Sequence, residues 1–83
     1  MKLTMTSTPN PNALKFTAEE SLFSKRIEVF KTNQTNSPIL TKLIAINGVI
    51  SLFGFNNFIT VCKSPEASWD DLLPQINAAL KEL

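Results

Sequence analysis

Residues 49–63 read VISLFGFNNFITVCK, and this stretch decides the architecture that the rest of the chain completes. Two alternating apolar runs flank Asn56-Asn57, and because asparagine tolerates the positive φ of a tight turn, the stretch predicts a β-hairpin. Successive strand residues point to opposite faces, so the hairpin presents two sets of side chains. One set is apolar and is expected to face the core: Ile50, Leu52, Ile59 and Val61. The other set is expected to face away from it: Ser51, Phe53, Phe58, Thr60 and Cys62.

Three shorter strands are predicted before the hairpin. Residues 2–8 (KLTMTST) alternate, residues 13–17 (ALKFT) place Leu14 and Phe16 inward, and residues 26–30 (RIEVF) place Ile27 and Val29 inward. Residues 17–25 are compatible with one helical turn, which is too short to favour a stable helix.

Two helices complete the pattern. Ser37 suits an N-cap and Pro38 the first helical position, and the left-handed stop expected at Asn47-Gly48 limits the first helix to residues 38–46. Ser68 suits the N-cap of a second helix. That helix carries apolar residues at helical spacing on one face: Trp69, Leu72, Leu73, Ile76, Ala79, Leu80 and Leu83.

The predicted element order is β-β-β-α-β-β-α within one domain, residues 1–83. This order favours an α+β fold, a two-layer sandwich with a mainly antiparallel sheet of about five short strands and two helices on one face. The opposite face of an antiparallel sheet can remain open to solvent. The residues expected there are Lys2, Thr4, Thr6, Lys15, Ser51, Phe53, Phe58, Thr60 and Cys62.

Charge and hydropathy exclude several classes of partner. Eight Lys+Arg against seven Asp+Glu give a net charge of +1, without the basic footprint of a nucleic-acid-binding protein. No apolar run approaches the ~20 residues that span a bilayer, and the first ten residues lack the apolar segment of a signal peptide. We therefore expect a cytoplasmic protein that contacts neither nucleic acid nor membrane.

The sequence offers little for catalysis or metal binding. The chain contains no histidine and one cysteine, Cys62, so the thiol and the serine hydroxyls have no imidazole base and no zinc-ligand spacing exists. An enzyme is not expected, and neither is a cofactor. Cys62 is the one candidate metal ligand, able to contribute one thiolate to a shared site, while the alternative is a half-buried thiol packed as a small hydrophobe.

Residues 8–16 (TPNPNALKF) form the first candidate contact surface. Each proline fixes its own φ and biases the preceding residue toward extended backbone, so the segment is stiff. Asn10, Asn12 and Lys15 would then be held in place before a partner arrives, which lowers the entropy lost on binding. The alternative is a hairpin connection whose asparagines bond to local backbone groups.

The second candidate surface is aromatic. Phe53 and Phe58 are expected opposite or nearly opposite each other on the open face, with Phe55 near the turn. Paired aromatic residues stabilise a hairpin by up to ~1 kcal/mol, so packing alone could account for them. An exposed aromatic pair surrounded by polar residues is also typical of a small binding patch.

Four stretches, in order along nearly the whole chain, resemble the N-terminal domain of Nfu/NifU-type iron–sulfur scaffold proteins. They are TPNPNALKF (8–16), SPILTKLIAINGV (37–49), FITVCK (58–63) and WDDLLPQI (69–76). The resemblance implies a role in iron–sulfur cluster biogenesis or delivery, in which this domain helps to recognise client or assembly proteins. This sequence lacks the Cys-x-x-Cys pair that carries the cluster in full-length members. Cys62 stands where the family usually carries threonine or another small polar residue, so the resemblance does not make it an inherited ligand.

The resulting hypothesis is a non-enzymatic adaptor that contacts iron–sulfur assembly or client proteins as a monomer or weak homodimer. The residues expected to contact the partner are Asn10, Asn12, Lys15, Phe53 and Phe58. Two alternatives stay open: iron or transient cluster binding through Cys62 in a dimer or complex, and a homodimerising domain without a cluster role.

Overall fold

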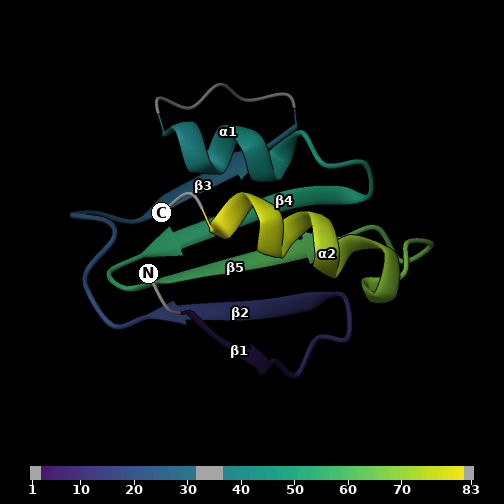
Figure 1. Cartoon of the computed structure of the whole chain (residues 1–83), viewed down its shortest axis with the longest axis horizontal. Helices are drawn as coiled ribbons and strands as arrows, with labels where there is room; N and C mark the ends of the chain where they lie inside the picture. Colours follow the sequence, from purple (N-terminus) through teal and green to yellow (C-terminus); the bar gives the residue numbers. More distant parts are fainter. Residues whose placement is uncertain (1–2, 32–36, 82–83) are drawn as a thin grey trace.

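The computed structural model describes residues 3–31 and 37–81, and within these ranges the chain forms five strands and two helices (Figure 1). The predicted element order is confirmed. Lys2, Leu83 and most of the polar segment before the first helix lie outside the described residues. The elements are β1 (Leu3–Ser7), β2 (Ala13–Ala18), β3 (Ile27–Phe30), α1 (Pro38–Ile44), β4 (Val49–Phe55), β5 (Phe58–Lys63) and α2 (Trp69–Leu80). Residues 19–26 contain no helix.

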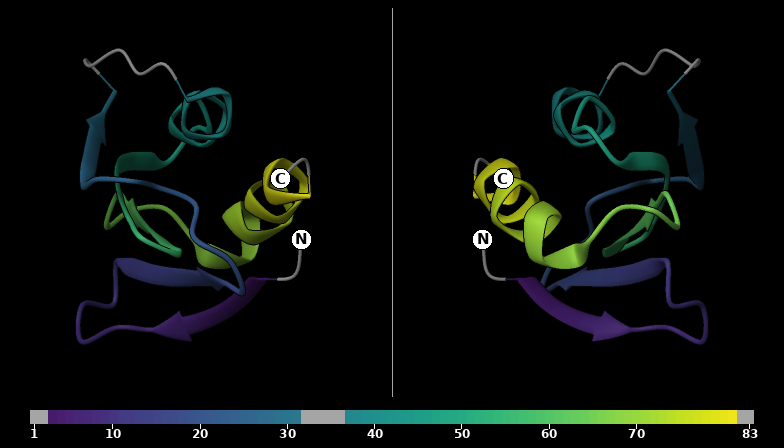
Figure 2. Two further views of the ribbon diagram at one scale, coloured as in Figure 1. Left: turned by 90° about the vertical axis from the view of Figure 1, so that its left-hand side faces the viewer. Right: turned by 90° about the vertical axis from the view of Figure 1, so that its right-hand side faces the viewer.

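The strands form one antiparallel sheet in the order β1-β2-β5-β4-β3. The predicted hairpin lies at its centre, with Asn56 at φ 53° in the turn. Both helices lie on one side of the sheet, and Figure 2 shows the two layers end-on. The α+β sandwich is therefore confirmed, with one sheet face left uncovered.

The core fills the space between sheet and helices. Strand register aligns inward side chains across the sheet, so that Leu52 lies between Val61 and Val29. A buried stripe from each helix covers these rows because helical spacing returns every third or fourth residue to one face. The buried helix residues are Leu40, Leu43 and Ile44 on α1 and Leu72, Ile76 and Leu80 on α2.

Both helix starts follow the local sequence. Ser37 Oγ accepts a hydrogen bond from the Leu40 N–H, and Ser68 Oγ accepts one from the Asp70 N–H. The first helix ends at Ile44, two residues earlier than predicted. The Ile46 N–H bonds instead to the Leu43 carbonyl, the i→i+3 pattern that tightens a helix end.

One predicted core residue is wrong. Ile50 is 45% exposed because a β-bulge interrupts the alternation at the start of β4. Val49 pairs with Lys63 and Ser51 pairs with Cys62, which leaves Ile50 without a partner. A bulge inserts one extra residue and shifts those before it to the opposite face, so Val49 is buried in place of Ile50.

The helices of the described ranges are too short to cross a lipid bilayer.

Candidate functional site

The uncovered sheet face carries four of the six phenylalanines of the chain. Strand partners point to the same face, and Leu52, Ile59 and Val61 point into the core, so the intervening positions point outward. Register therefore places Phe53, Phe55 and Phe58 on the uncovered face, and Phe30 joins them from β3 opposite Ser51. These four aromatic side chains therefore lie on the sheet face opposite α1 and α2, and Figure 2 shows both helices on the other side of the sheet.

Three of these rings and one cation form a contiguous group, which we call the Phe58 cluster: Lys15, Phe53, Phe55 and Phe58. The Phe53 and Phe58 rings stack, with centroids 5.8 Å apart and planes inclined by 28°. The Phe55 ring meets the Phe58 ring edge-on at 6.3 Å and 73°. Lys15 Nζ lies 4.4 Å from the centroid of the Phe58 ring. An aromatic pair contributes about 0.5–1.5 kcal/mol beyond its buried area, so the cluster is ordered before any partner binds.

The register explains why these side chains meet. Phe58 pairs directly with Phe55 on one side and with Thr17 on the other. Phe53 and Lys15 both pair with Thr60, two residues further along β5, so each reaches Phe58 diagonally. The sequence-based prediction of near-opposite phenylalanines thus corresponds to a diagonal pair, and Lys15 joins it from β2.

Phe30 and Phe55 were not among the predicted contact residues, yet they are 48% and 46% exposed. The outward position of Phe30 could have been predicted from the alternation of β3. The alternation that places Ile27 and Val29 inward places Glu28 and Phe30 outward. For Phe55 the pairing with Phe58 depends on which two residues form the turn.

The proline–asparagine segment forms a turn closed by its own polar groups. Asn10 Oδ1 accepts a hydrogen bond from the Asn12 N–H at 2.8 Å, and the Asn10 carbonyl accepts one from the Ala13 N–H at 3.0 Å. Thr8 Oγ1 lies 2.9 Å from the Asn10 carbonyl and 3.0 Å from that of Ala13. The Asn10 side chain therefore bonds to the local backbone, as expected for a hairpin connection whose asparagines bond to neighbouring backbone groups.

The same segment is fastened to the β5–α2 end of the molecule. Lys63 Nζ donates a hydrogen bond to Asn12 Oδ1 at 2.9 Å, and Trp69 Nε1 donates one to the Pro11 carbonyl at 3.0 Å. Lys63 Nζ also lies 5.7 Å from the centroid of the Trp69 ring. We call Asn12, Lys63 and Trp69 the loop anchor.

The structure brings the predicted contact residues together in two groups. Lys15 and Phe53 both contact the Phe58 ring, whereas Asn10 and Asn12 lie near the opposite end of β2. Asn12 directly precedes Ala13, the first residue of β2, which pairs with Cys62. Phe58 pairs with Thr17, near the other end of the strand.

Cys62 is half-buried on the uncovered face, between its strand partners Ala13 and Ser51. Across residues 3–31 and 37–81, no three His, Cys, Asp or Glu side chains lie close enough together to hold a metal ion.

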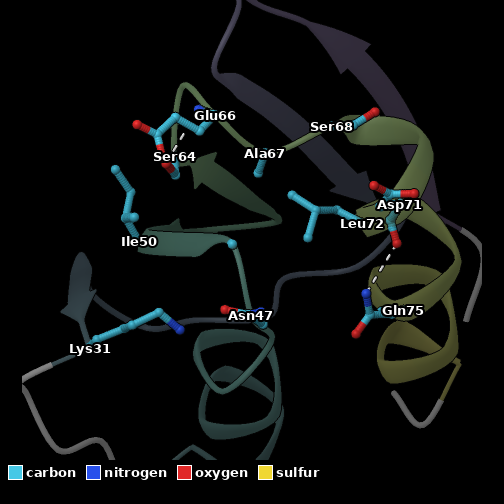
Figure 3. Close-up of a pocket in the computed structure, with 11 residues that line it drawn as sticks. Lys31, Asn47, Ile50, Ser64, Glu66, Ala67, Ser68, Asp71, Leu72 and Gln75 are labelled. Atoms are coloured by element: carbon cyan, nitrogen blue, oxygen red, sulfur yellow. Dashed lines mark hydrogen bonds between the residues drawn. The ribbon is translucent and has the colours of Figure 1, made fainter.

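A pocket of about 720 Å³ lies between the end of α1, the start of β4 and the first turns of α2 (Figure 3). Two of its polar side chains, Lys31 and Gln75, bond to carbonyls of the adjoining backbone. Lys31 Nζ donates to the carbonyls of Ile44 at 2.8 Å and Ile46 at 3.1 Å, and Gln75 Nε2 donates to the Asp71 carbonyl at 3.1 Å. Among the described residues no buried side-chain nitrogen or oxygen lacks a partner. The Phe58 cluster is therefore the stronger candidate site.

Curated relatives match almost the whole chain. The Conserved virulence factor C of Staphylococcus aureus (strain MRSA252) is 37% identical over 73 residues, which is 87% of this chain and 20% of that protein. The protein of the same name from Staphylococcus saprophyticus is 32% identical over 76 residues, or 90% of this chain. The chain thus spans about a fifth of the length of the curated relatives it matches.

Solved structures share the fold from end to end. The crystal structure of protein SAV1430 from Staphylococcus aureus has a TM-score of 0.86 at 29% identity, covering 96% of this chain and 99% of that one. The solution structure of a NifU-like protein from Saccharomyces cerevisiae has a TM-score of 0.84 at 29% identity, covering 98% and 76% respectively. The family model "Scaffold protein Nfu/NifU N terminal" matches residues 3–83. Since that match spans nearly every residue, this chain belongs to the Nfu/NifU N-terminal family.

Proposed function

We propose that this chain is a protein-interaction module, an adaptor that binds an assembly or client protein in iron–sulfur cluster biogenesis. Family membership supports the link to iron–sulfur chemistry. The observation that carries the adaptor role is the Phe58 cluster on a sheet face without helices. The absence of histidine from the sequence argues against a catalytic role that needs an unperturbed base near neutral pH.

The Phe58 cluster has the composition and rigidity of a binding centre. Phenylalanine is among the aromatic residues that are enriched in the buried centre of protein interfaces. Burying apolar area contributes roughly 25 cal/mol per Å², and Phe55 still exposes 46% of its surface for a partner to cover. Rings that already stack on one another lose little rotamer freedom when a partner binds.

Lys15 adds a charge to this apolar centre. Its ammonium group lies over the Phe58 ring, 4.4 Å from the ring centroid, so it is positioned to meet an acidic group of the partner. The cation–π contact contributes about 0.5–1 kcal/mol at an exposed site. Reversal of this charge is therefore expected to disturb binding more than folding.

Asn10 and Asn12 form the second contact region of the proposal. Asn10 is exposed in a turn that the loop anchor holds against β5 and α2. A partner that spans the length of β2 would touch both the turn and the Phe58 cluster.

The test is affinity purification from the source cells with chemical crosslinking, followed by direct titration of each recovered protein. The test variants are Lys15→Glu and Phe53→Ser. Their matched controls are Lys25→Glu, which reverses an exposed charge in the β2–β3 connection, and Ile50→Ser, which removes an exposed apolar side chain beside the pocket of Figure 3.

We expect iron–sulfur assembly or client proteins to bind the wild type and both controls, and each test variant to weaken binding about tenfold or more. Binding that survives both test variants would remove the Phe58 cluster from the interface. Recovery only of proteins unrelated to iron–sulfur clusters would reject the proposed pathway while leaving the surface in place.

A further inference from the structure

Strand β1 is an edge strand without the usual protection against pairing. Within the described residues it pairs with β2 alone, and its sequence Leu-Thr-Met-Thr-Ser contains neither charge nor proline. Native sheets normally protect an edge with charged residues, proline or a bulge. The other edge, β3, has such protection, since it is four residues long and Glu28 lies 3.9 Å from Arg26.

The hydrogen bonds of β2 reveal which backbone groups of β1 point outward. The Ala18 N–H bonds to the Asn57 carbonyl and the Asn12 carbonyl accepts from the Lys63 N–H, so even-numbered residues along this stretch direct their backbone groups toward β5. Backbone groups alternate in direction along a strand, so Lys15 and Thr17 direct theirs toward β1.

Register then assigns the groups of β1 itself. Lys15 and Thr17 pair with Thr6 and Thr4, which therefore use their backbone groups to bond to β2. The three residues that alternate with Thr4 and Thr6 direct their N–H and C=O groups away from the sheet: Leu3, Met5 and Ser7.

We infer that a second copy of this chain pairs with β1, antiparallel and about a two-fold axis through Met5, to join the two sheets into one. In this register Met5 faces Met5 of the partner subunit, and Leu3 faces Ser7 of the partner subunit. All three outward-directed residues thereby find backbone partners, as a hydrogen-bonded antiparallel register requires.

The side chains of β1 suit this self-pairing. On the uncovered face Thr4 meets Thr6 of the partner subunit, a favourable cross-strand pair. On the helix face Met5 is 51% exposed beside a groove of about 360 Å³ at the end of α2. Methionine is flexible enough to fill irregular gaps, so Met5 of the partner subunit can cover this groove. The residues that line the groove are Leu3, Met5, Phe16, Asn77, Leu80 and Lys81.

A proline at position 5 tests how much the backbone hydrogen bonds of β1 contribute to dimerisation. Met5→Pro removes the outward N–H, whereas the β1–β2 bonds made by Thr4 and Thr6 remain, since an edge strand tolerates proline where its N–H faces solvent. Met5→Lys instead places two like charges at the two-fold axis. The matched control is Phe30→Lys, which introduces the same charge at a similarly exposed site on the opposite edge strand.

Sedimentation equilibrium across a dilution series tests the pairing. We expect wild type and Phe30→Lys to shift from monomer to dimer with rising concentration. We expect Met5→Pro and Met5→Lys to weaken dimerisation about tenfold or more. A wild type that stays monomeric up to about 1 mM would overturn the inference, as would a dimer that both Met5 variants leave unchanged.

Hydrogen exchange of the wild type provides a readout that does not depend on whether a variant folds. The Met5 amide should exchange more slowly at concentrations where the dimer forms, and an exchange rate independent of concentration would refute pairing through β1. Neither result bears on partner binding by the Phe58 cluster, which lies on the sheet face rather than its edge.

Discussion

Replacement of Asn12 by alanine removes the side-chain acceptor of a buried ammonium group. Lys63 is 7% exposed, and its Nζ is 2.9 Å from Asn12 Oδ1 and 3.3 Å from the Ser64 carbonyl. In Asn12→Ala only the longer of these two contacts remains. A hydrogen bond to a charged group contributes about 1.5–3 kcal/mol, and its loss is most unfavourable where water cannot replace it.

We therefore expect Asn12→Ala to lower the free energy of unfolding by about 1.5–3 kcal/mol. For a domain of this size, 1 kcal/mol shifts Tm by about 4–8 °C, so the expected decrease is about 6–24 °C. The transition can be followed by urea denaturation, with far-UV circular dichroism and the fluorescence of Trp69, the only tryptophan in the sequence.

A double-mutant cycle with Lys63→Met tests whether the stability loss comes from the Asn12–Lys63 hydrogen bond. Methionine keeps most of the buried length of the side chain without the charge, so Asn12 loses its buried partner. In that background Asn12→Ala should cost less than about 0.5 kcal/mol, which leaves a coupling energy of at least about 1 kcal/mol. An equal cost in both backgrounds would refute the assignment of the stability loss to the Asn12–Lys63 hydrogen bond.

Asn12→Asp separates anchoring from partner contact. It preserves an acceptor for Lys63 Nζ and adds the opposite charge, so stability should be retained. If the variant is stable but binds the partner less well, Asn12 contacts that partner directly; if stability and binding are both retained, the residue acts through the loop anchor.

Three further predictions follow from local geometry. A Cβ at Gly54 would lie 2.7 Å from Phe23 Cε2, so Gly54→Ala should lower the free energy of unfolding by about 1–3 kcal/mol in urea denaturation, and an unchanged midpoint would contradict this. Gly48 has a φ of 105° and a Cβ there would lie 3.0 Å from Leu72 Cδ2, so Gly48→Ala should cost about 1 kcal/mol or more in the same assay, whereas equal or greater stability would show that the loop relaxes. Cys62→Ser should leave the visible absorbance after anaerobic iron and sulfide reconstitution unchanged, because Cys62 lies among non-ligating strand partners; loss of absorbance would instead support a shared metal site.

The elements of the fold were readable from local sequence. Hairpin alternation, asparagine in the turn, Ser37 before Pro38 and Gly48 after the first helix each act over a few residues. These signals therefore predicted the element order, the two-layer architecture and the face on which Phe53 and Phe58 lie. The family could likewise be identified from its motifs.

The register of the strand pairs could not be predicted from the local sequence, because it depends on how the strands pack in the tertiary structure. The β-bulge that exposes Ile50 results from matching β4 to β5, and neither strand encodes it alone. The burial of Lys63 likewise depends on the position of Asn12, which is 51 residues away in the chain.

Apart from Ile50 at the β-bulge, the sequence by itself determined which residues of the hairpin point out of the sheet, because strand alternation is a property of the local backbone. Only the tertiary structure determined which of them touch. Lys15 reaches Phe58 because β2 lies beside β5 in one particular register, and a shift of one residue would turn its side chain to the other face. Register is chosen by the fit of the entire core, and that fit exists only once the sheet and both helices have packed together.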